Sequence, residues 1–509
     1  MTIADSTTSF IQTSCLLSQP SFHSAKITVN HWQLRDLVQP LSSDPNEILY
    51  TYDDTIRSTN RKTDKVSTVT KLDFHPRCFQ EVDDLIVSGG VISSVNNSNS
   101  MTNLNRSFTT LNDGNTGAGS TWRGLFSLYN KNTQESQTIK LGSYINNNVS
   151  ISKQSNGQYA SYVCNNDMNL YNTDINNTSI TVKDAVNLDF PLNHSALSDD
   201  GKNLVVVGDS SNIVLLRPDQ NGSNTLCRDN IIETQCDSGF STSFDSSGLQ
   251  FATCFQDGTC LIYDLRNISA GPMKHVYSTR RHSSNGAFRC VKYSRGTDDL
   301  LVLSEHVGRV HVVDTRDFNN HQVIMLPVND NPRSRQASSA SLSNITSQSR
   351  SNSSVENVNP SIYNPKILEY NDILNYEGNL AAINTFENTF GTAYNTNHNS
   401  RNFNNFNLLS AIEDEGEDDG MDDEFIGSDE NQMDEEVSTL GTLHRSSVGS
   451  NLTASTMSSE FDYTDNDISG LDWYEDRYGS HIVIGCDKGL INWDIDSWGR
   501  RSFPSFKLA

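Results

Sequence analysis

Short apolar runs separated by polar turns recur along this chain at a nearly constant spacing. In each copy, an apolar run leads to a Gly-containing turn and then to a run rich in β-branched residues. A second polar turn follows, and the copy closes with a strand that ends in an aromatic or apolar residue and then Asp or Asn. Such runs are typical of β-strands. A fixed repeat of them indicates the blades of a WD40-like β-propeller.

The second turns of consecutive copies set the period of the repeat. With Asn166, Ser210, Asp257 and Val307 as markers, the separations are 44, 47 and 50 residues. These values are close to the roughly 40 to 45 residues of a four-stranded blade. The next turn, at 487–489, comes about 181 residues after Val307, so an insertion of about 130 residues interrupts the array.

Two further copies precede the regular block. One covers residues 69–130 and contains Phe74-His75-Pro76, which resembles the turn that follows the first long strand of many WD40 repeats. Its hairpin carries an insert at about 92–120 that is rich in Ser, Asn, Thr and Gly, and we expect this insert to be disordered. A weaker copy lies at 47–56. We therefore predict an all-β fold, a propeller of seven blades, with six or eight as alternatives.

Composition divides the chain into propeller and inserted segments. We expect a disordered N-terminal tail at 1–25, the first part of the propeller at 26–329, an insertion at 330–465, and a closing blade with a C-terminal tail at 466–509. Closure of one propeller requires the last blade to pack beside N-terminal strands, because closure removes exposed sheet edges.

The long insertion changes character along its length. It opens basic and serine-rich, becomes rich in asparagine, and then runs into an acidic tract at 413–436. Such a composition cannot bury enough apolar surface to offset the entropy of ordering, so we expect disorder. Two apolar islands lie within it, at 367–386 and 406–412. Each is interpreted either as a strand of an elaborated blade or collapsed loop, or as a short helix that folds on a partner.

The net charge of −25 is largely local. The tract at 413–436 holds fourteen acidic residues and no Lys or Arg, and without them the net charge would be −11. An acidic chain that lacks a basic stripe has no electrostatic footprint for nucleic acid or anionic lipid, so we expect neither as a partner.

Cysteine usage and the N-terminus favour a cytoplasmic protein, with the nucleus as an alternative. The nine cysteines are an odd number without a Cys-x-x-Cys pair, which argues against a disulfide framework and against metal binding. The N-terminus has neither a basic region nor an apolar run of the secretory kind. No segment approaches the ~20 apolar residues of a membrane span.

The common catalytic and cofactor-binding motifs are missing from the sequence. There is no nucleophile elbow, Walker loop, zinc-protease motif or dinucleotide fingerprint. Paired carboxylates such as Asp199-Asp200 and Asp298-Asp299 fall at predicted hairpin turns, where Asp is expected for its local hydrogen bonding. We therefore predict a protein that is not an enzyme, with no catalytic residues, no cofactor and no metal.

Two segments resemble a fungal family of WD40-like proteins that carries a C-terminal domain of unknown function. The closing segment, from Ile468-Ser-Gly470-Leu-Asp-Trp473 to Gly499-Arg500-Arg501-Ser502-Phe503-Pro504-Ser505-Phe506, resembles the signature of that domain. The blade at 238–267 is similar to the family as well. One family member is the substrate receptor of the yeast GID (CTLH) ubiquitin ligase, where it recognises N-terminal threonine, and it has a paralogue.

This resemblance implies a substrate-recognition adaptor that binds protein N-termini (N-degrons) through its propeller. Its partners would be ubiquitin ligase core subunits and substrate N-terminal peptides. The alternative is a general WD40 scaffold or regulatory protein whose acidic insertion recruits nuclear or signalling partners.

A pocket for a protein N-terminus must neutralise an α-ammonium group, so it needs a carboxylate and backbone carbonyl groups. Asp209, Asp257 and Asp487 are candidates, because they lie at second turns that share one rim of an aligned propeller. Their alternative role is that of ordinary turn residues. Arg500 and Arg501 are candidates for pairing with carboxylates of the propeller or with the acidic surface of a partner.

Three serines of the insertion are candidate phosphorylation sites. Ser338 follows Arg335 at the spacing of a basophilic kinase target, and Ser446 and Ser447 follow Arg445. Serine is abundant in this insertion, which is the alternative explanation. A phosphate at Ser338 would reverse the charge of the only basic stretch of the insertion.

Overall fold

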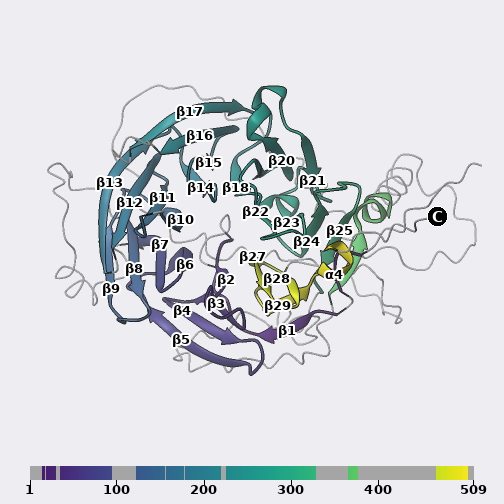
Figure 1. Ribbon diagram of the computed structural model, residues 1–509, viewed down its shortest axis with the longest axis horizontal. Helices are drawn as coiled ribbons and strands as arrows, with labels where there is room; N and C mark the ends of the chain where they lie inside the picture. Colours follow the sequence, from purple (N-terminus) through teal and green to yellow (C-terminus); the bar gives the residue numbers. More distant parts are fainter. Residues whose placement is uncertain are drawn as a thin grey trace, which may run out of the picture. The chain divides into compact units, whose positions relative to one another are not determined.

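The computed structural model describes residues 14–17, 19–29, 35–93, 122–154, 156–176, 178–218, 225–327, 365–376 and 466–501. These residues form seven antiparallel sheets that are the blades of one β-propeller around a central channel (Figure 1). The predicted fold class and the predicted number of blades are both confirmed.

The first four blades follow the chain in order. Blade 1 holds β2 (Val38–Pro40), β3 (Glu47–Tyr52), β4 (Thr55–Asn60) and β5 (Lys65–Lys71); blade 2 holds β6 (Pro76–Val82), β7 (Leu85–Ser93), β8 (Trp122–Asn130) and β9 (Ser136–Lys140). Blade 3 holds β10 (Asn146–Lys153), β11 (Tyr159–Asn165), β12 (Asn169–Asn176) and β13 (Ser179–Asn187); blade 4 holds β14 (Leu192–Leu197), β15 (Leu204–Gly208), β16 (Asn212–Pro218) and β17 (Leu226–Glu233).

Blade 5 also follows the chain in order, whereas blades 6 and 7 each include a strand from a distant part of the chain. Blade 5 holds β18 (Gly239–Phe244), β19 (Gln250–Phe255), β20 (Thr259–Asp264) and β21 (Lys274–Tyr277); blade 6 holds β22 (Phe288–Tyr293), β23 (Leu300–Glu305), β24 (Arg309–Asp314), β25 (His321–Met325) and β26 (Lys366–Glu369). Blade 7 holds β27 (Ile468–Asp476), β28 (Gly479–Cys486), β29 (Gly489–Asp494) and β1 (Ser21–Ser24). Short helices are η2 (Leu265–Ala270), η3 (Ser284–Gly286) and α4 (Ser497–Arg501).

The ring is closed by the two ends of the chain. β1 pairs antiparallel with β29, from Ser21 opposite Asn492 to Ser24 opposite Gly489, and so supplies the outer strand of the last blade. Residues 21–24, which the sequence placed in a disordered tail, form this strand instead. The pairing satisfies the backbone edge of β29, which would otherwise remain open.

The Phe74-His75-Pro76 turn lies elsewhere than its sequence resemblance indicated. It does not follow the first strand of a blade; it joins β5, the outer strand of blade 1, to β6, the inner strand of blade 2. Phe74 is buried in the cluster that these two blades share. The turn is thus a linker between blades, and the residues 69–71 assigned with it belong to blade 1.

The insertion contributes one strand to the propeller. Ile367 in β26 pairs with Ile324 in β25, and a helical turn at 370–376 follows, with Ile373 only 2% exposed. The interpretation of the first apolar island as an added strand therefore holds for 366–369. The second island at 406–412, and most of the insert predicted at 92–120, lie outside the described residues.

Candidate functional site

The inner strand of six blades has a β-bulge near its first residue, at equivalent places. A bulge leaves one extra residue unpaired and re-aims its side chain. The six bulge residues, which we call the throat ring, are Arg77, Asn147, Asn193, Phe240, Arg289 and Ser469.

Members of the throat ring contact the next blade. The Asn147 side-chain amide donates to the Leu192 carbonyl (2.8 Å), and the Asn193 amide donates to the Gly239 carbonyl (3.0 Å). The Arg289 guanidinium lies 4.2 Å from the centre of the Phe240 ring. Four consecutive blades are thus joined by side chains at this end of the channel.

Buried cations gather at the same end. His306 lies between two arginines, with Nε2 3.3 Å from Arg35 Nη2 and Nδ1 3.3 Å from Arg289 Nη2. Burial and then Arg35 lower the pKa of Arg289 to about 9, and burial with the neighbouring arginines lowers the pKa of His306 to about 3. Asp467 is the carboxylate that contacts Arg35, at 3.4 Å. Two buried arginines therefore lie at this end of the channel, one of them beside the carboxylate of Asp467.

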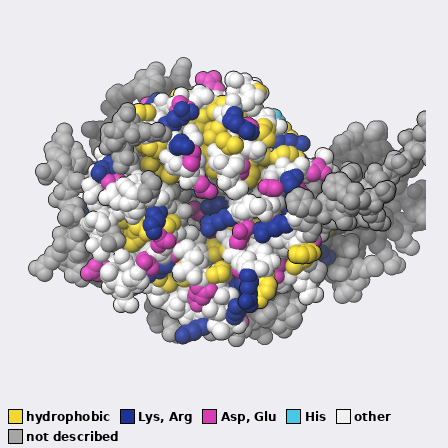
Figure 2. Space-filling model, in the orientation of Figure 1, with side chains coloured by type: hydrophobic (Ala, Val, Ile, Leu, Met, Phe, Trp, Pro, Cys, Tyr) yellow, Lys and Arg dark blue, Asp and Glu magenta, His cyan; other side chains and the backbone are white. Residues whose placement is uncertain are grey.

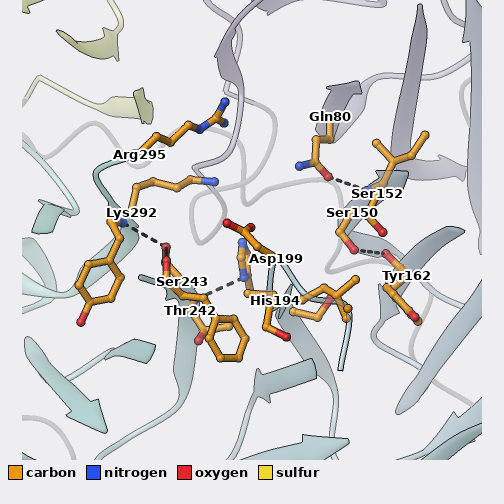
Figure 3. A pocket seen from close by; sticks show the side chains of 18 of the residues that line it. Gln80, Ser150, Ser152, Tyr162, His194, Asp199, Thr242, Ser243, Lys292 and Arg295 are labelled. Atoms are coloured by element: carbon orange, nitrogen blue, oxygen red, sulfur yellow. Dashed lines mark hydrogen bonds between the residues drawn. The ribbon is translucent and has the colours of Figure 1, made fainter. Parts of the chain in front are cut away.

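A cavity of about 1260 Å³ opens at the other end of the channel. Its walls are the distal parts of the inner strands and the loops that lead from them to the second strands (Figure 3). Typical small-molecule pockets measure about 300–1,000 Å³. No residue of the throat ring lines this cavity. The cavity and the throat ring therefore lie at different levels of the channel.

The wall of the pocket is polar and uneven in side-chain size. The positions three residues beyond the bulges are small on blades 3, 4 and 5, where Ser150, Ala196 and Ser243 line the pocket, and large on blades 2 and 6, where Gln80 and Lys292 line it. Side chains also tie neighbouring inner strands together: Gln80 accepts from the Ile151 N–H and Ser243 from the Tyr293 N–H. The open volume of the pocket therefore lies toward blades 3 to 5, where the wall side chains are small.

His194 is a neutral donor in the wall. The Thr242 N–H donates to its Nδ1 at 3.3 Å, so the ring proton resides on Nε2. Burial, and next the charge of Lys292, lower the pKa of His194 to about 3. The imidazole adds no positive charge to the pocket at neutral pH.

The cations of the pocket are matched by carboxylates. Lys292 Nζ lies 3.3 Å from Asp36, and Arg295 lies 3.6 Å from Asp472. Burial opposes the charge of Lys292, yet Asp36, Cys290 and Asp472 outweigh it and raise its pKa. Lys202 pairs with Asp200 at 3.0 Å.

Two acidic groups of the pocket wall, Asp199 and Asp245, make no ion pair with described residues. Asp245 accepts from the Leu249 and Gln250 N–H groups of its own turn, at 3.0 and 2.9 Å. Asp199 is exposed, lines the pocket, and makes no ion pair with the described part of the chain. In Figure 3 its carboxylate lies beside His194 over the open space. The turn role predicted for the Asp199-Asp200 pair holds for Asp200, which accepts from Ser198 Oγ and the Lys202 N–H. Asp199 is free for a ligand.

The sequence-predicted carboxylates lie on the opposite rim and on separate blades. Asp209 accepts from the Asn193 amide of the throat ring (2.8 Å), and Asp257 accepts from the Thr259 N–H within its own turn (2.9 Å). Burial raises the pKa of Asp487. The structure does not bring the three together, and their role in binding stays a prediction.

Arg500 and Arg501 pair with propeller carboxylates. Arg500 lies 2.8 Å from Asp314 of blade 6 and donates to the Asp298 carbonyl. Arg501 contacts the Asp298 carboxylate (2.7 Å) and Glu475 of blade 7 (2.9 Å). Helix α4 thereby fastens the two blades to each other. The candidate serines Ser338, Ser446 and Ser447 lie outside the described residues.

Within the described ranges, no group of three or more His, Cys, Asp or Glu side chains is placed to hold a metal ion. No helix in those ranges is long and apolar enough to cross a membrane. On the face drawn in Figure 2, acidic and basic side chains are interspersed rather than gathered into one stripe.

Part of blade 6 matches the model of a known protein family. Residues 286–325, which cover β22 to β25, match the uncharacterised protein domain DUF2415. The match falls on blade 6, not on the closing segment that carried the sequence resemblance.

Two yeast proteins are similar over much of the chain. "Uncharacterized protein YLR149C" of Saccharomyces cerevisiae is 28% identical over 708 aligned residues, covering 96% of this chain and 95% of that protein. "Uncharacterized protein C4G3.03" of Schizosaccharomyces pombe is 25% identical over 315 residues, covering 60% and 80%. A chain in the crystal structure of the mitotic checkpoint complex superposes with a TM-score of 0.42 and 10% identity over 58% of this chain and 78% of that one.

Proposed function

We propose that this protein is a non-catalytic substrate-recognition adaptor that binds the N-terminal ends of other proteins in the pocket at the end of the channel. It presents them to a ubiquitin ligase of the GID (CTLH) type. The carboxylate of Asp199, which lines the pocket and makes no ion pair with described residues, is the observation that carries this proposal. It offers a partner to the α-ammonium group that the N-terminal end of a chain carries and an internal segment lacks.

Electrostatics favours an N-terminus over a C-terminus. A terminal carboxylate would need a cation, and Lys292 and Arg295 are already matched by Asp36 and Asp472. An α-ammonium group needs a carboxylate, and Asp199 offers one. The N–H of His194 Nε2 and the hydroxyl groups of Ser150 and Ser243 offer further partners for a peptide carbonyl and a polar first side chain.

The ligase assignment rests on the resemblance to the family of the GID receptor. An adaptor needs no catalytic group, and its work would take place in the cytoplasm or the nucleus, where that ligase meets its substrates. The ligase core subunits would be its constant partners and the N-terminal peptides its changing ones.

Peptide binding is tested by fluorescence anisotropy with a labelled five-residue peptide that begins with threonine. The free peptide should bind and its N-acetylated form should not, because acetylation removes the ammonium group. Asp199→Asn should weaken binding about 10-fold or more, since a hydrogen bond to a charged group contributes about 1.5–3 kcal/mol.

Asp189→Asn is the matched control, because Asp189 is an exposed carboxylate outside the pocket. Equal binding of the free and acetylated peptides would refute the proposed recognition.

Ligase membership is tested by affinity purification and mass spectrometry from cells that are shifted between carbon sources. Ligase core subunits should co-purify in at least one condition. Their absence under every condition would favour the alternative role of a general scaffold.

A further inference from the structure

The charges of the pocket wall do not balance. The wall holds five carboxylates and four cations, which are Asp36, Asp199, Asp200, Asp245 and Asp472, and Lys153, Lys202, Lys292 and Arg295. Each cation already has a carboxylate partner; in the same order, the partners are Asp83, Asp200, Asp36 and Asp472. Asp199 and Asp245 make no ion pair with described residues. Once Asp83 is counted with its lysine, the wall therefore has an excess of two negative charges.

The two unpaired carboxylates lie on loops that touch. Asp199 belongs to the loop between β14 and β15 of blade 4, and Asp245 to the loop between β18 and β19 of blade 5. A Cβ atom added to Gly248, in the loop of Asp245, would lie 3.6 Å from Ser198 Cβ, in the loop of Asp199. The excess negative charge is therefore gathered at the junction of blades 4 and 5.

The contacts of Asp245 orient its carboxylate without neutralising it. Oδ1 accepts from two backbone N–H groups of its own turn (3.0 and 2.9 Å), and Oδ2 accepts from Ser247 Oγ (2.5 Å). The pKa of Arg266 is raised mainly by its hydrogen bonds to Asp264 (2.9 and 2.6 Å) and to a smaller extent by the charge of Asp245, so this guanidinium is committed to Asp264. A carboxylate has about four acceptor sites, so Oδ2 can still receive a donor from a ligand.

The open volume of the pocket lies beside these charges. The wall side chains are small on blades 3, 4 and 5, at Ser150, Ala196 and Ser243. His194, which is 9% exposed, faces the same space beside Asp199 (Figure 3). Its Nδ1 accepts from Thr242, whereas its Nε2 makes no hydrogen bond with the described part of the chain. A donor buried to this extent without a partner points to a ligand that supplies an acceptor.

We propose that the pocket selects polypeptides whose second or third residue is Lys or Arg. This inference rests on the proposed function. Asp199 would hold the α-ammonium group, His194 would donate to a peptide carbonyl, and Asp245 would pair with the basic side chain. An extended chain advances at most about 3.3–3.6 Å per residue, so a partner for a loop that touches the loop of Asp199 must come from the first few residues. An acidic side chain at the same place would meet Asp245 and no unpaired cation of the wall.

The test measures fluorescence anisotropy with four labelled ten-residue peptides that begin with threonine. Three carry a single Lys, at position 2, 3 or 8, and the fourth has norleucine, the uncharged analogue, at all three positions. Lys at position 2 or 3 should raise the affinity over the norleucine peptide by about 5-fold or more, because the ammonium group gains a charged partner. Lys at position 8 should give no such gain, although it experiences the same overall attraction to a chain of net charge −25.

Asp245→Asn should remove the gain from the early Lys and leave the affinity for the norleucine peptide unchanged. Asparagine keeps a side-chain oxygen that can accept from the N–H groups of the turn, so the loop should retain its shape. Asp317→Asn is the matched control, because Asp317 is an exposed turn carboxylate that accepts from the Asn319 N–H (3.1 Å) and lies outside the pocket.

An equal gain from Lys at position 8 overturns the inference, because the attraction would then be general. An unchanged gain in Asp245→Asn, or an equal loss of affinity for the Lys and norleucine peptides in that variant, also overturns it. In each of these cases, binding of the norleucine peptide that is lost on acetylation still supports the proposed function. If the norleucine peptide and its acetylated form bind equally, or no peptide binds, the proposed function and this inference both fall.

Discussion

Arg500 is the residue whose removal should reveal how the last blade is fastened. Its side chain is 5% exposed, and Asp314, its partner at 2.8 Å, is 9% exposed. It also donates to the Asp298 carbonyl at 2.6 and 2.9 Å and lies 3.3 Å from Cys15 Sγ. One side chain therefore joins two strands or loops of blade 6 to the N-terminal segment that leads into β1.

Arg500→Ala should lower the free energy of unfolding by about 3 kcal/mol, because breaking a buried ion pair leaves the other charge uncompensated. In a domain of this size, 1 kcal/mol corresponds to about 2 °C, so the Tm should fall by roughly 6 °C. Thermal unfolding followed by circular dichroism measures this change. Arg477→Ala is the control, since Arg477 is exposed and should leave the Tm within about 1 °C.

A double variant separates the ion pair from simple loss of packing. Arg500→Ala with Asp314→Ala should cost less than the sum of the two single changes, because no uncompensated charge remains. If Arg500→Ala melts at the temperature of the control variant, helix α4 does not fasten the closing blade and the reasoning is wrong.

Three further predictions concern stability. His194 and His306 have pKa values lowered from 6.5 to about 3 by burial, so the unfolded state takes up protons that the folded state does not, and stability should fall as pH drops below 6.5. At pH 5, each of the two histidines should lower the free energy of unfolding by about 2 kcal/mol. Urea titrations at pH 7 and pH 5 would measure this loss, and equal unfolding midpoints at the two pH values would contradict the prediction. Replacing 332–464 by a Gly/Ser linker should leave a folded but less stable propeller, and restoring 366–376 within the linker should recover the lost stability, because β26 pairs with β25. Identical Tm values for the two variants would show that this strand adds no stability. Deleting residues 1–25 should lower the Tm by several degrees more than deleting 1–13, because only the first deletion removes β1; equal values would argue against closure.

The sequence predicts the blades well because their geometry is local. A strand alternates its side chains across the sheet, and each turn requires Gly, Asn or Asp, so both leave a periodic trace. The added strand β1 was missed for the opposite reason, and β26 was predicted only as one of two alternatives for its island. β1 and β26 span four residues each, and their pairing depends on partners hundreds or tens of residues away.

The pocket was harder to predict than the fold. A β-bulge carries no distinctive composition, so neither the throat ring nor the pocket beyond it could be predicted from the residues. Asp199 and Asp200 are adjacent acids in one hairpin, and only the folded chain shows that one completes the turn while the other faces the pocket. The choice of Asp209, Asp257 and Asp487 followed a real alignment of turns but identified the rim opposite the cavity.

The most direct test of the account is to locate a bound N-terminus by photo-cross-linking. A peptide with free N-terminal threonine and a benzophenone side chain at its second position would be irradiated with the full-length protein, and the cross-linked residues would be mapped by mass spectrometry. The account predicts cross-links to the pocket wall, at Ser150, Ala196 or Ser243, that disappear when the peptide is acetylated. Cross-links confined to the rim of Asp209, Asp257 and Asp487 would contradict it.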